Sequence, residues 1–198
     1  RHDFGAWSQT AVAAGMMMPL VGFAFSTAIV RSFSGEGAGV LRLRFFGRLG
    51  AVVLGLFALA ASLLAAGRDG IAGLIYGGPG GVPLLPALLL LLAAEVGVDF
   101  AVAWLRSLGR MQMIAAITGL RSLLRYGVVL ALVAGGAPPL AQWLTVYATV
   151  QAALMLLVLV ATAVLLQRTG AAAPAPTLDP PSLRAVLRFC APLVLLAV

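Results

Sequence analysis

Long apolar stretches, separated by short polar or glycine- and proline-rich segments, make up most of this chain. A helix that crosses a bilayer needs about 20 mostly apolar residues, and several of these stretches are that long. Membrane β-strands would instead give segments of about 10 residues with alternating hydrophobicity, but the stretches here are longer and apolar all round. The pattern therefore predicts an all-α, polytopic transmembrane helix bundle.

The boundaries of the apolar stretches predict about five complete spans and the start of a sixth. The complete spans are expected at residues 4–30, 45–66, 83–105, 111–133 and 140–166, and the sixth begins at residues 183–198. The Gly/Pro-rich segment 67–82 has an apolar centre that we expect at the membrane interface. The Pro/Ala-rich segment 167–182 predicts a stiff linker without a packed core.

These boundaries predict three parts of the chain. Residues 1–166 form a transmembrane lobe, residues 167–182 a cytoplasmic linker, and residues 183–198 the start of the first helix of a second lobe. The chain starts without Met and stops within an apolar stretch, so we expect more protein on both sides.

The composition excludes an ordinary soluble domain. Of 198 residues, 62% are hydrophobic and 10% are charged, whereas soluble domains carry about 25% charged residues. The 13 basic residues, all arginine, outnumber six acidic ones and give a net charge of +7. In a soluble protein this excess would suggest nucleic-acid binding. Because the arginines here lie mainly between apolar stretches, they indicate membrane topology, and no nucleic-acid partner is expected.

The distribution of arginines predicts the orientation of the chain in the membrane. With alternating loops, one side of the membrane receives nine arginines and the other receives Arg1 and Arg68. The nine are Arg31, Arg42, Arg44, Arg48, Arg106, Arg110, Arg168, Arg184 and Arg188. Since positively charged loops stay in the cytoplasm, the side with nine arginines is expected to be cytoplasmic.

Four ionisable residues are expected deep in the membrane. Glu95 and Asp99 lie four residues apart in the third span, and Arg121 and Arg125 have the same spacing in the fourth. Each pair therefore lies on one helix face. A charge at the bilayer centre is costly, so it must face a partner or a cavity. Either the four groups form ion pairs that lock two helices together, or they line a path that binds an anion or carries protons.

Other polar and aromatic residues have simpler interpretations. Arg31, at the end of the first span, is either an anchor whose side chain extends to the cytoplasmic surface or a cation facing the inner mouth of a cavity. Trp7, Trp104, Trp143 and Tyr147 lie near predicted span ends, as in the aromatic belt of a membrane protein.

The sequence gives little support for catalysis. It contains no GxxxxGK[ST] phosphate loop, no HExxH or other paired-histidine motif and no Ser/His/Asp combination. The single Cys190 and the single His2 cannot form a cluster of metal ligands. We therefore expect no metal site, no cofactor and no enzymatic activity in this part of the protein.

Several motifs occur in an order that resembles a known family. They are FGAWSQT at the start of a helix, STAIVRSFS at its exit, WLRSLGRMQMIAAITGLRSLLRYG across the turn between two spans, and LRAVLRFCAPLVLLAV after the linker. Together they resemble the polysaccharide biosynthesis flippases, the Wzx-like branch of the multidrug/oligosaccharidyl-lipid/polysaccharide exporter superfamily. The resemblance covers nearly all 198 residues.

The resemblance implies a fold and a function. The spans would be helices two to six and part of seven of a two-lobed transporter in the bacterial inner membrane, with helix one missing. Its lobes would rock around a basic cavity that receives an undecaprenyl-diphosphate-linked sugar, and its partners would be this substrate, membrane lipids and the second lobe. Arg31, Arg121 and Arg125 would bind the diphosphate or an acidic sugar, while Glu95 and Asp99 would couple an ion or pair with those arginines.

Three alternatives remain at this point. A cation-coupled multidrug exporter of the same superfamily would favour an acidic cavity, which Arg121 and Arg125 argue against. A membrane-embedded glycosyl- or phosphotransferase would need clustered carboxylates or a catalytic base from elsewhere in the protein. A non-transporting scaffold would tolerate replacement of all four intramembrane charges by apolar residues.

Overall fold

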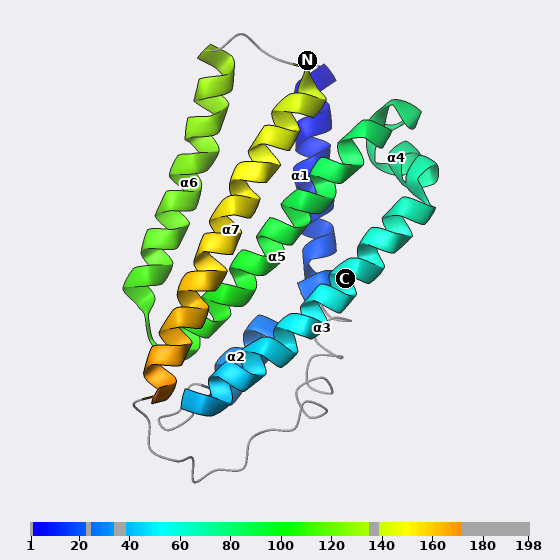
Figure 1. The fold of residues 1–198 in the computed structure, drawn as a ribbon. Helices are drawn as coiled ribbons and strands as arrows, with labels where there is room; N and C mark the ends of the chain where they lie inside the picture. The colour runs from blue at the N-terminus through cyan, green and yellow to red at the C-terminus, as the bar shows by residue number, and fades with distance from the viewer. Residues whose placement is uncertain (1, 23–24, 34–38, 135–138, 172–198) are drawn as a thin grey trace.

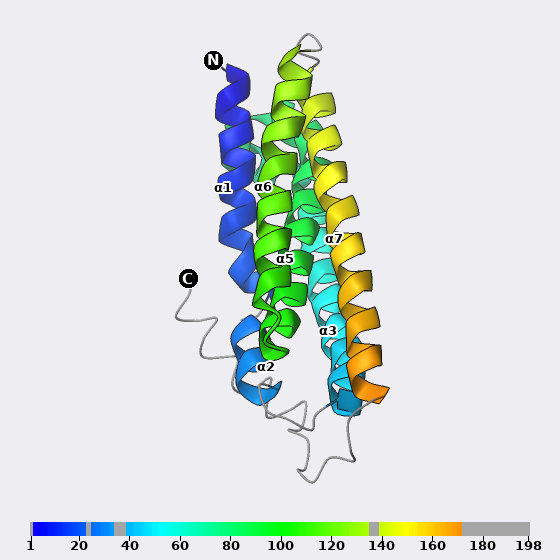
Figure 2. The same cartoon turned by 90° about the vertical axis from the view of Figure 1, so that its left-hand side faces the viewer.

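The computed structural model describes residues 2–22, 25–33, 39–134 and 139–171, and all of its regular elements are helices. No strand occurs in these ranges, which confirms the all-helical prediction for them. The elements are α1 (His2–Gly22), α2 (Phe25–Phe33), α3 (Gly39–Ala66), α4 (Arg68–Tyr76), the 3₁₀ helix η1 (Pro79–Leu84), α5 (Leu85–Ser107), α6 (Met111–Ala134) and α7 (Leu140–Ala171). The long helices run in alternating directions (Figures 1 and 2).

Four helical segments in the described part of the chain are long and apolar enough to cross a membrane, as expected of a multi-pass membrane protein. They are Arg42–Ala66, Gly80–Ser107, Met111–Ala131 and Leu140–Thr169, which correspond to the predicted second to fifth spans. α1 is not among them, because polar residues such as Gln9 reduce the hydropathy of its first half. The predicted sixth span lies outside the described residues.

The predicted boundaries differ from the structure around the first and second spans. Instead of one helix over residues 4–30, two helices lie on either side of residues 23–24, which are not described. The predicted spans leave residues 31–44 as a loop between them, but α2 continues to Phe33 and α3 starts at Gly39. Arginine is a good helix former, so the basic residues of this segment extend the helix that follows them.

Arg42 joins the end of α2 to the start of α3. Its Nε and Nη2 atoms donate hydrogen bonds to the carbonyl oxygen of Phe33, at 3.2 and 2.8 Å. The last carbonyl groups of a helix have no partner within the helix. Arg42 therefore satisfies a carbonyl group at the end of α2 and ties α2 to the start of α3.

The start of the predicted linker is also helical. α7 continues to Ala171 and so includes residues 167–171, while the rest of the linker lies outside the described residues. Gln167 and Arg168 both favour helix, so the helix extends beyond the apolar stretch that the hydropathy pattern detects.

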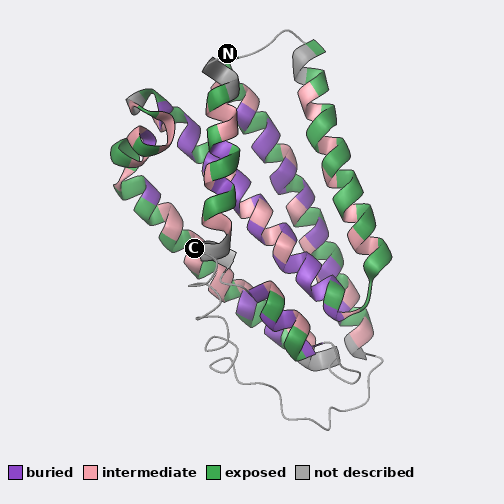
Figure 3. Cartoon of the chain, turned by 180° about the vertical axis from the view of Figure 1, so that it is seen from behind, coloured by how far each residue is buried: buried purple, intermediate pink, exposed green. Residues whose placement is uncertain are grey.

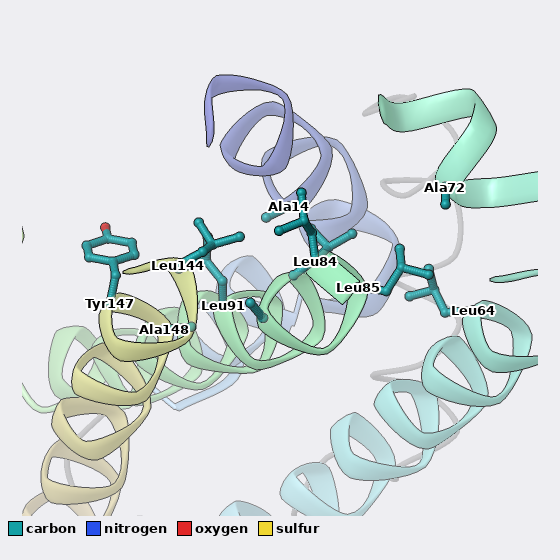
Figure 4. Packing of buried hydrophobic residues seen from close by; sticks show 11 residues of the cluster. Ala14, Leu64, Ala72, Leu84, Leu85, Leu91, Leu144, Tyr147 and Ala148 are labelled. Atoms are coloured by element: carbon teal, nitrogen blue, oxygen red, sulfur yellow. The ribbon is translucent and has the colours of Figure 1, made fainter. Parts of the chain in front are cut away.

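α5 is the central helix of the bundle and α6 is a peripheral one (Figure 3). α5 contains 15 buried residues, whereas no described side chain of α6 is buried. Around α5 the apolar side chains form a cluster near its N-terminal end, which joins α1, α4 and α7 (Figure 4). A second, aromatic cluster near its C-terminal end joins α5 to α2 and α3. The bundle is therefore organised around α5.

Close packing of α5 on α7 depends on Gly97. A Cβ atom added at this position would overlap the Cγ and Sδ atoms of Met155 on α7. Because Gly97 has no side chain, the Met155 side chain fits against the backbone of α5, and the two helices can approach closely.

We expect Gly97→Leu to lower the free energy of unfolding by about 1–3 kcal/mol, because the added side chain overpacks the interface with α7. The measurement is thermal unfolding of the purified protein in detergent. Gly55→Leu on α3 is the matched control, since a Cβ atom there meets nothing within 4 Å. Equal unfolding temperatures for the two variants would contradict this account of the α5–α7 contact.

Candidate functional site

A tight turn places α5 and α6 antiparallel to each other. Gly109 has a φ of +67°, a left-handed conformation that glycine adopts readily, and the backbone N–H of Arg110 donates to the carbonyl of Leu105 at 3.0 Å. From this turn, Glu95 is roughly 18 Å along α5 and Arg121 roughly 15 Å along α6, at about 1.5 Å per residue. The turn therefore brings the two side chains to similar depths.

Glu95 interacts with both intramembrane arginines. Its Oε2 atom forms an ion pair with Nη2 of Arg121, and its Oε1 atom lies 3.7 Å from Nη2 of Arg125. The Nε atom of Arg125 donates a hydrogen bond to the hydroxyl oxygen of Tyr147 on α7, at 2.9 Å. One carboxylate thus interacts with two guanidinium groups. Together the three groups carry a net charge of +1. We call Glu95, Arg121 and Arg125 the charged triad.

Two members of the charged triad, Glu95 and Arg125, border a cavity of about 280 Å³ within the bundle, and Arg121 is joined to it through its ion pair with Glu95. Residues from four helices line it: Trp7, Ala11, Ala14, Gly15 and Met18 of α1, Leu91 and Glu95 of α5, Arg125 of α6 and Tyr147 of α7. Small and apolar residues thus form most of α1's contribution, and the charged groups come from α5 and α6. Arg125 retains a 48% exposed side chain, against 18% for Glu95, so an incoming anion could reach it.

Asp99 has different surroundings from Glu95, although the two lie on one face of α5. It interacts electrostatically with Arg106 of α5 and, more weakly, with Arg121, and it shares a hydrogen bond with Ser26 of α2. In the described part of the chain, no ion pair joins Asp99 to Arg121 or Arg125. The structure therefore brings Arg121 and Arg125 to Glu95, while Asp99 faces the end of the bundle where α2 lies.

Arg31 is not part of this group. It lies in the last turn of α2 and is exposed there, and it does not line the cavity that Arg125 borders. Figure 1 shows α2 near one end of the bundle, whereas Arg125 lies in the middle of α6 (Met111–Ala134).

All described arginines other than Arg68, Arg121 and Arg125 gather at one end of the bundle. Arg31 ends α2, Arg106 ends α5 and Arg168 ends α7, and the same end holds the start of α3 and the α5–α6 turn (Figure 1). Arg68 lies at the opposite end, at the start of α4. The three remaining arginines outside the spans, Arg1, Arg184 and Arg188, are not described.

Two of the four aromatic residues predicted for the belt, Trp104 and Tyr147, are buried and do not belong to it, whereas Trp7 and Trp143 are partly exposed. Trp104 is 0% exposed and Tyr147 is 2% exposed, whereas belt residues face the lipid headgroups. Trp104 instead packs on Phe33, Phe46 and Phe100. Position near a span end is shared by belt residues and by buried ones, so it could not distinguish them.

Sequence reasoning also missed the role of Tyr147 beside Arg125. The available signal was the spacing of Leu144, Tyr147, Ala148 and Gln151, which are all buried. Residues at such intervals share one face of a helix. On this face of α7 the hydroxyl of Tyr147 meets Arg125, whereas the amide nitrogen of Gln151 has no hydrogen-bond partner among the described residues.

No group of three or more potential metal ligands occurs among the described residues. No protein-family model, no curated protein and no solved structure matches the chain. The family resemblance therefore remains a prediction from the motifs, and the charged triad and its cavity are the structural basis for a functional proposal.

Proposed function

We propose that this chain belongs to a transporter that moves a lipid-linked oligosaccharide or exopolysaccharide precursor across the bacterial inner membrane. The observation that carries the proposal is the charged triad beside a cavity, in which one carboxylate balances two guanidinium groups. Transport would proceed by alternating access, with a second lobe closing the cavity from the other side. We propose no catalytic step for this part of the protein.

The excess positive charge favours an anionic substrate. Charges within the membrane are costly without a partner, and Glu95 alone leaves one guanidinium charge unbalanced. Arginine stays charged at any depth and can form bidentate hydrogen bonds to phosphate. Tyr147 holds Nε of Arg125, which leaves the two Nη atoms of that guanidinium for Glu95 and an anion. The diphosphate of a lipid-linked sugar has the required charge.

The family resemblance supplies the rest of the proposal. It suggests the lipid-linked sugar as substrate, the two-lobed architecture and the inner membrane as location. We propose Arg125, which lines the cavity, and Arg121, which shares Glu95 with it, for the phosphates, and Glu95 for charge pairing. Arg31 and Asp99 neither line this cavity nor form an ion pair with the charged triad among the described residues, so we assign them no contact with the substrate there.

We expect the double variant Arg121→Ala/Arg125→Ala to insert into the membrane normally but to accumulate lipid-linked sugar on the cytoplasmic side. Surface polysaccharide should fall by at least tenfold, because the cavity loses both phosphate ligands. The measurements are membrane fractionation of the variant, extraction of lipid-linked sugar and quantification of surface polysaccharide in the native host.

The matched control is Arg44→Ala/Arg48→Ala. It also removes two arginines, but these are exposed residues near the start of α3. It should leave transport close to that of the parent protein. Normal surface polysaccharide from the Arg121/Arg125 variant would contradict the proposal and would support the scaffold alternative.

A further inference from the structure

A chain of aromatic contacts leads from α1 to the charged triad. The rings of Trp7 on α1 and Trp143 on α7 meet edge to face, with centroids 5.8 Å apart at 69°. Trp143 stacks on Tyr147, at 6.4 Å and 16°, and the hydroxyl of Tyr147 accepts the hydrogen bond from Arg125. Aromatic rings and a guanidinium group are thus continuous across three helices.

The members of this chain differ in how much surface they present. Tyr147 is buried, with 2% exposed, while Trp7 and Trp143 are only partly buried. Trp7 lines the same cavity as Arg125 and Glu95, and Trp143 packs against Trp7 edge to face. Trp7 and Tyr147 are the aromatic residues in the cavity lining; Trp7 contributes the partly exposed ring, and the buried Tyr147 acts through Arg125.

An indole face recognises two kinds of group, and the charge of the site distinguishes them. Its negative face attracts cations and also C–H groups, such as those on the apolar face of a sugar ring. The charged triad carries an excess positive charge, so it repels a cation from this cavity. A neutral, C–H-rich ring attached to an anionic group satisfies both the indole and the arginines.

The size of the cavity limits how much of such a ligand it holds. Ligand pockets range from about 300 to 1,000 Å³, and a cavity of about 280 Å³ lies just below this range. It suits one sugar ring with its attached phosphate better than a whole oligosaccharide.

We propose that Trp7, supported by Trp143, is the platform on which the first sugar ring of the substrate stacks, next to the arginines that hold its phosphates. This inference rests on the proposed function and adds a determinant of specificity to it. The platform makes the site prefer a sugar-bearing lipid diphosphate over the bare lipid diphosphate.

The experiment compares two probes on the full chain in detergent. The probes are undecaprenyl diphosphate and undecaprenyl-diphosphate-linked N-acetylglucosamine. A Trp104→Phe background leaves Trp7 and Trp143 as the only sources of tryptophan fluorescence, since the chain contains three tryptophans. The sugar-bearing probe should bind about three- to tenfold more tightly and should change the emission more than the bare probe does.

Substitutions separate the platform from the phosphate ligands. Trp7→Ala and, independently, Trp143→Ala should abolish the difference between the probes, whereas Trp7→Phe should retain part of it. Tyr147→Phe keeps the ring and removes the hydroxyl, so it should weaken both probes equally. Tyr126→Ala is the matched control, because Tyr126 is 68% exposed on α6 and does not line the cavity. Thermal unfolding of each variant monitors the contact between α1 and α7.

The outcomes distinguish the platform from the transport proposal. Equal affinity of the parent for the two probes, or a preference that persists in folded Trp7→Ala or Trp143→Ala protein, would overturn the platform and leave the proposed diphosphate site intact. A role limited to joining α1 to α7 would lower the unfolding temperature without changing the preference, which also overturns it. Failure of the parent to bind either probe would count against the proposed function itself.

Discussion

Glu95→Leu is expected to lower the free energy of unfolding by about 2–4 kcal/mol, because it leaves two partly buried guanidinium groups without their carboxylate partner. Glu95 is the carboxylate that contacts both Arg121 and Arg125. Without it, two guanidinium groups face each other within the bundle, with Tyr147 as the remaining partner of Arg125. The measurement is unfolding by heat or by denaturing detergent, with the fraction of folded protein followed by circular dichroism.

Two further variants test this explanation. Asp69→Asn is the control, because Asp69 forms a 3.8 Å ion pair with Arg68 in which both side chains are largely exposed. Such pairs contribute about 0–1 kcal/mol. Glu95→Gln combined with Arg121→Gln should recover much of the stability lost in Glu95→Leu, because the charges are removed together. A Glu95→Leu variant as stable as Asp69→Asn would show that the arginines do not need this carboxylate.

Trp104→Ala should also cost about 3–5 kcal/mol, because it opens a cavity in a packed core. Trp104 is 0% exposed, and its ring centroid lies 5.1 Å from that of Phe33, 5.9 Å from that of Phe46 and 6.3 Å from that of Phe100. These contacts join α5 to α2 and α3. Removal of the indole should loosen both helices, as measured by thermal unfolding and by hydrogen exchange in α2.

Trp104→Phe should be much less costly than Trp104→Ala. It keeps an aromatic ring in the cluster, and it removes an indole N–H that has no hydrogen-bond partner among the described residues. Buried donors of this kind are themselves unfavourable. Tyr126→Ala, at an exposed position of α6, is the control for the loss of an aromatic ring. If Trp104→Ala and Tyr126→Ala were equally stable, the aromatic cluster would not anchor α2 and α3.

Hydropathy was sufficient to predict the helices whose lengths the bilayer sets. The spans predicted at residues 111–133 and 140–166 correspond to α6 (Met111–Ala134) and α7 (Leu140–Ala171), because apolar residues over about 30 Å of thickness leave few alternatives. The ends in basic segments were harder to predict. A hydropathy pattern leaves arginine out of a predicted span, although arginine favours helix. α3 therefore begins six residues before its predicted span, and α7 ends five residues after its own.

The candidate site was partly predictable for a similar reason. Helical rise fixes the depths of Glu95 and Arg121, and the short α5–α6 connection makes the helices neighbours, so their proximity follows from the sequence. Which face of α7 turns inward depends on its packing against α5, including the contact of Met155 at Gly97. The sequence pattern alone does not predict how these two helices pack. The hydrogen bond between Tyr147 and Arg125 and the position of Trp7 beside the cavity therefore emerge only from the structure.

The pairing of one carboxylate with two guanidinium groups has a consequence for the stoichiometry of the proposed transport. A monoanionic cargo would make the site electroneutral. A diphosphate diester carries two negative charges, so its entry would leave one unit of negative charge in excess. Entry of one monovalent cation would restore neutrality, and the proposal then predicts that each cargo molecule crosses together with one cation.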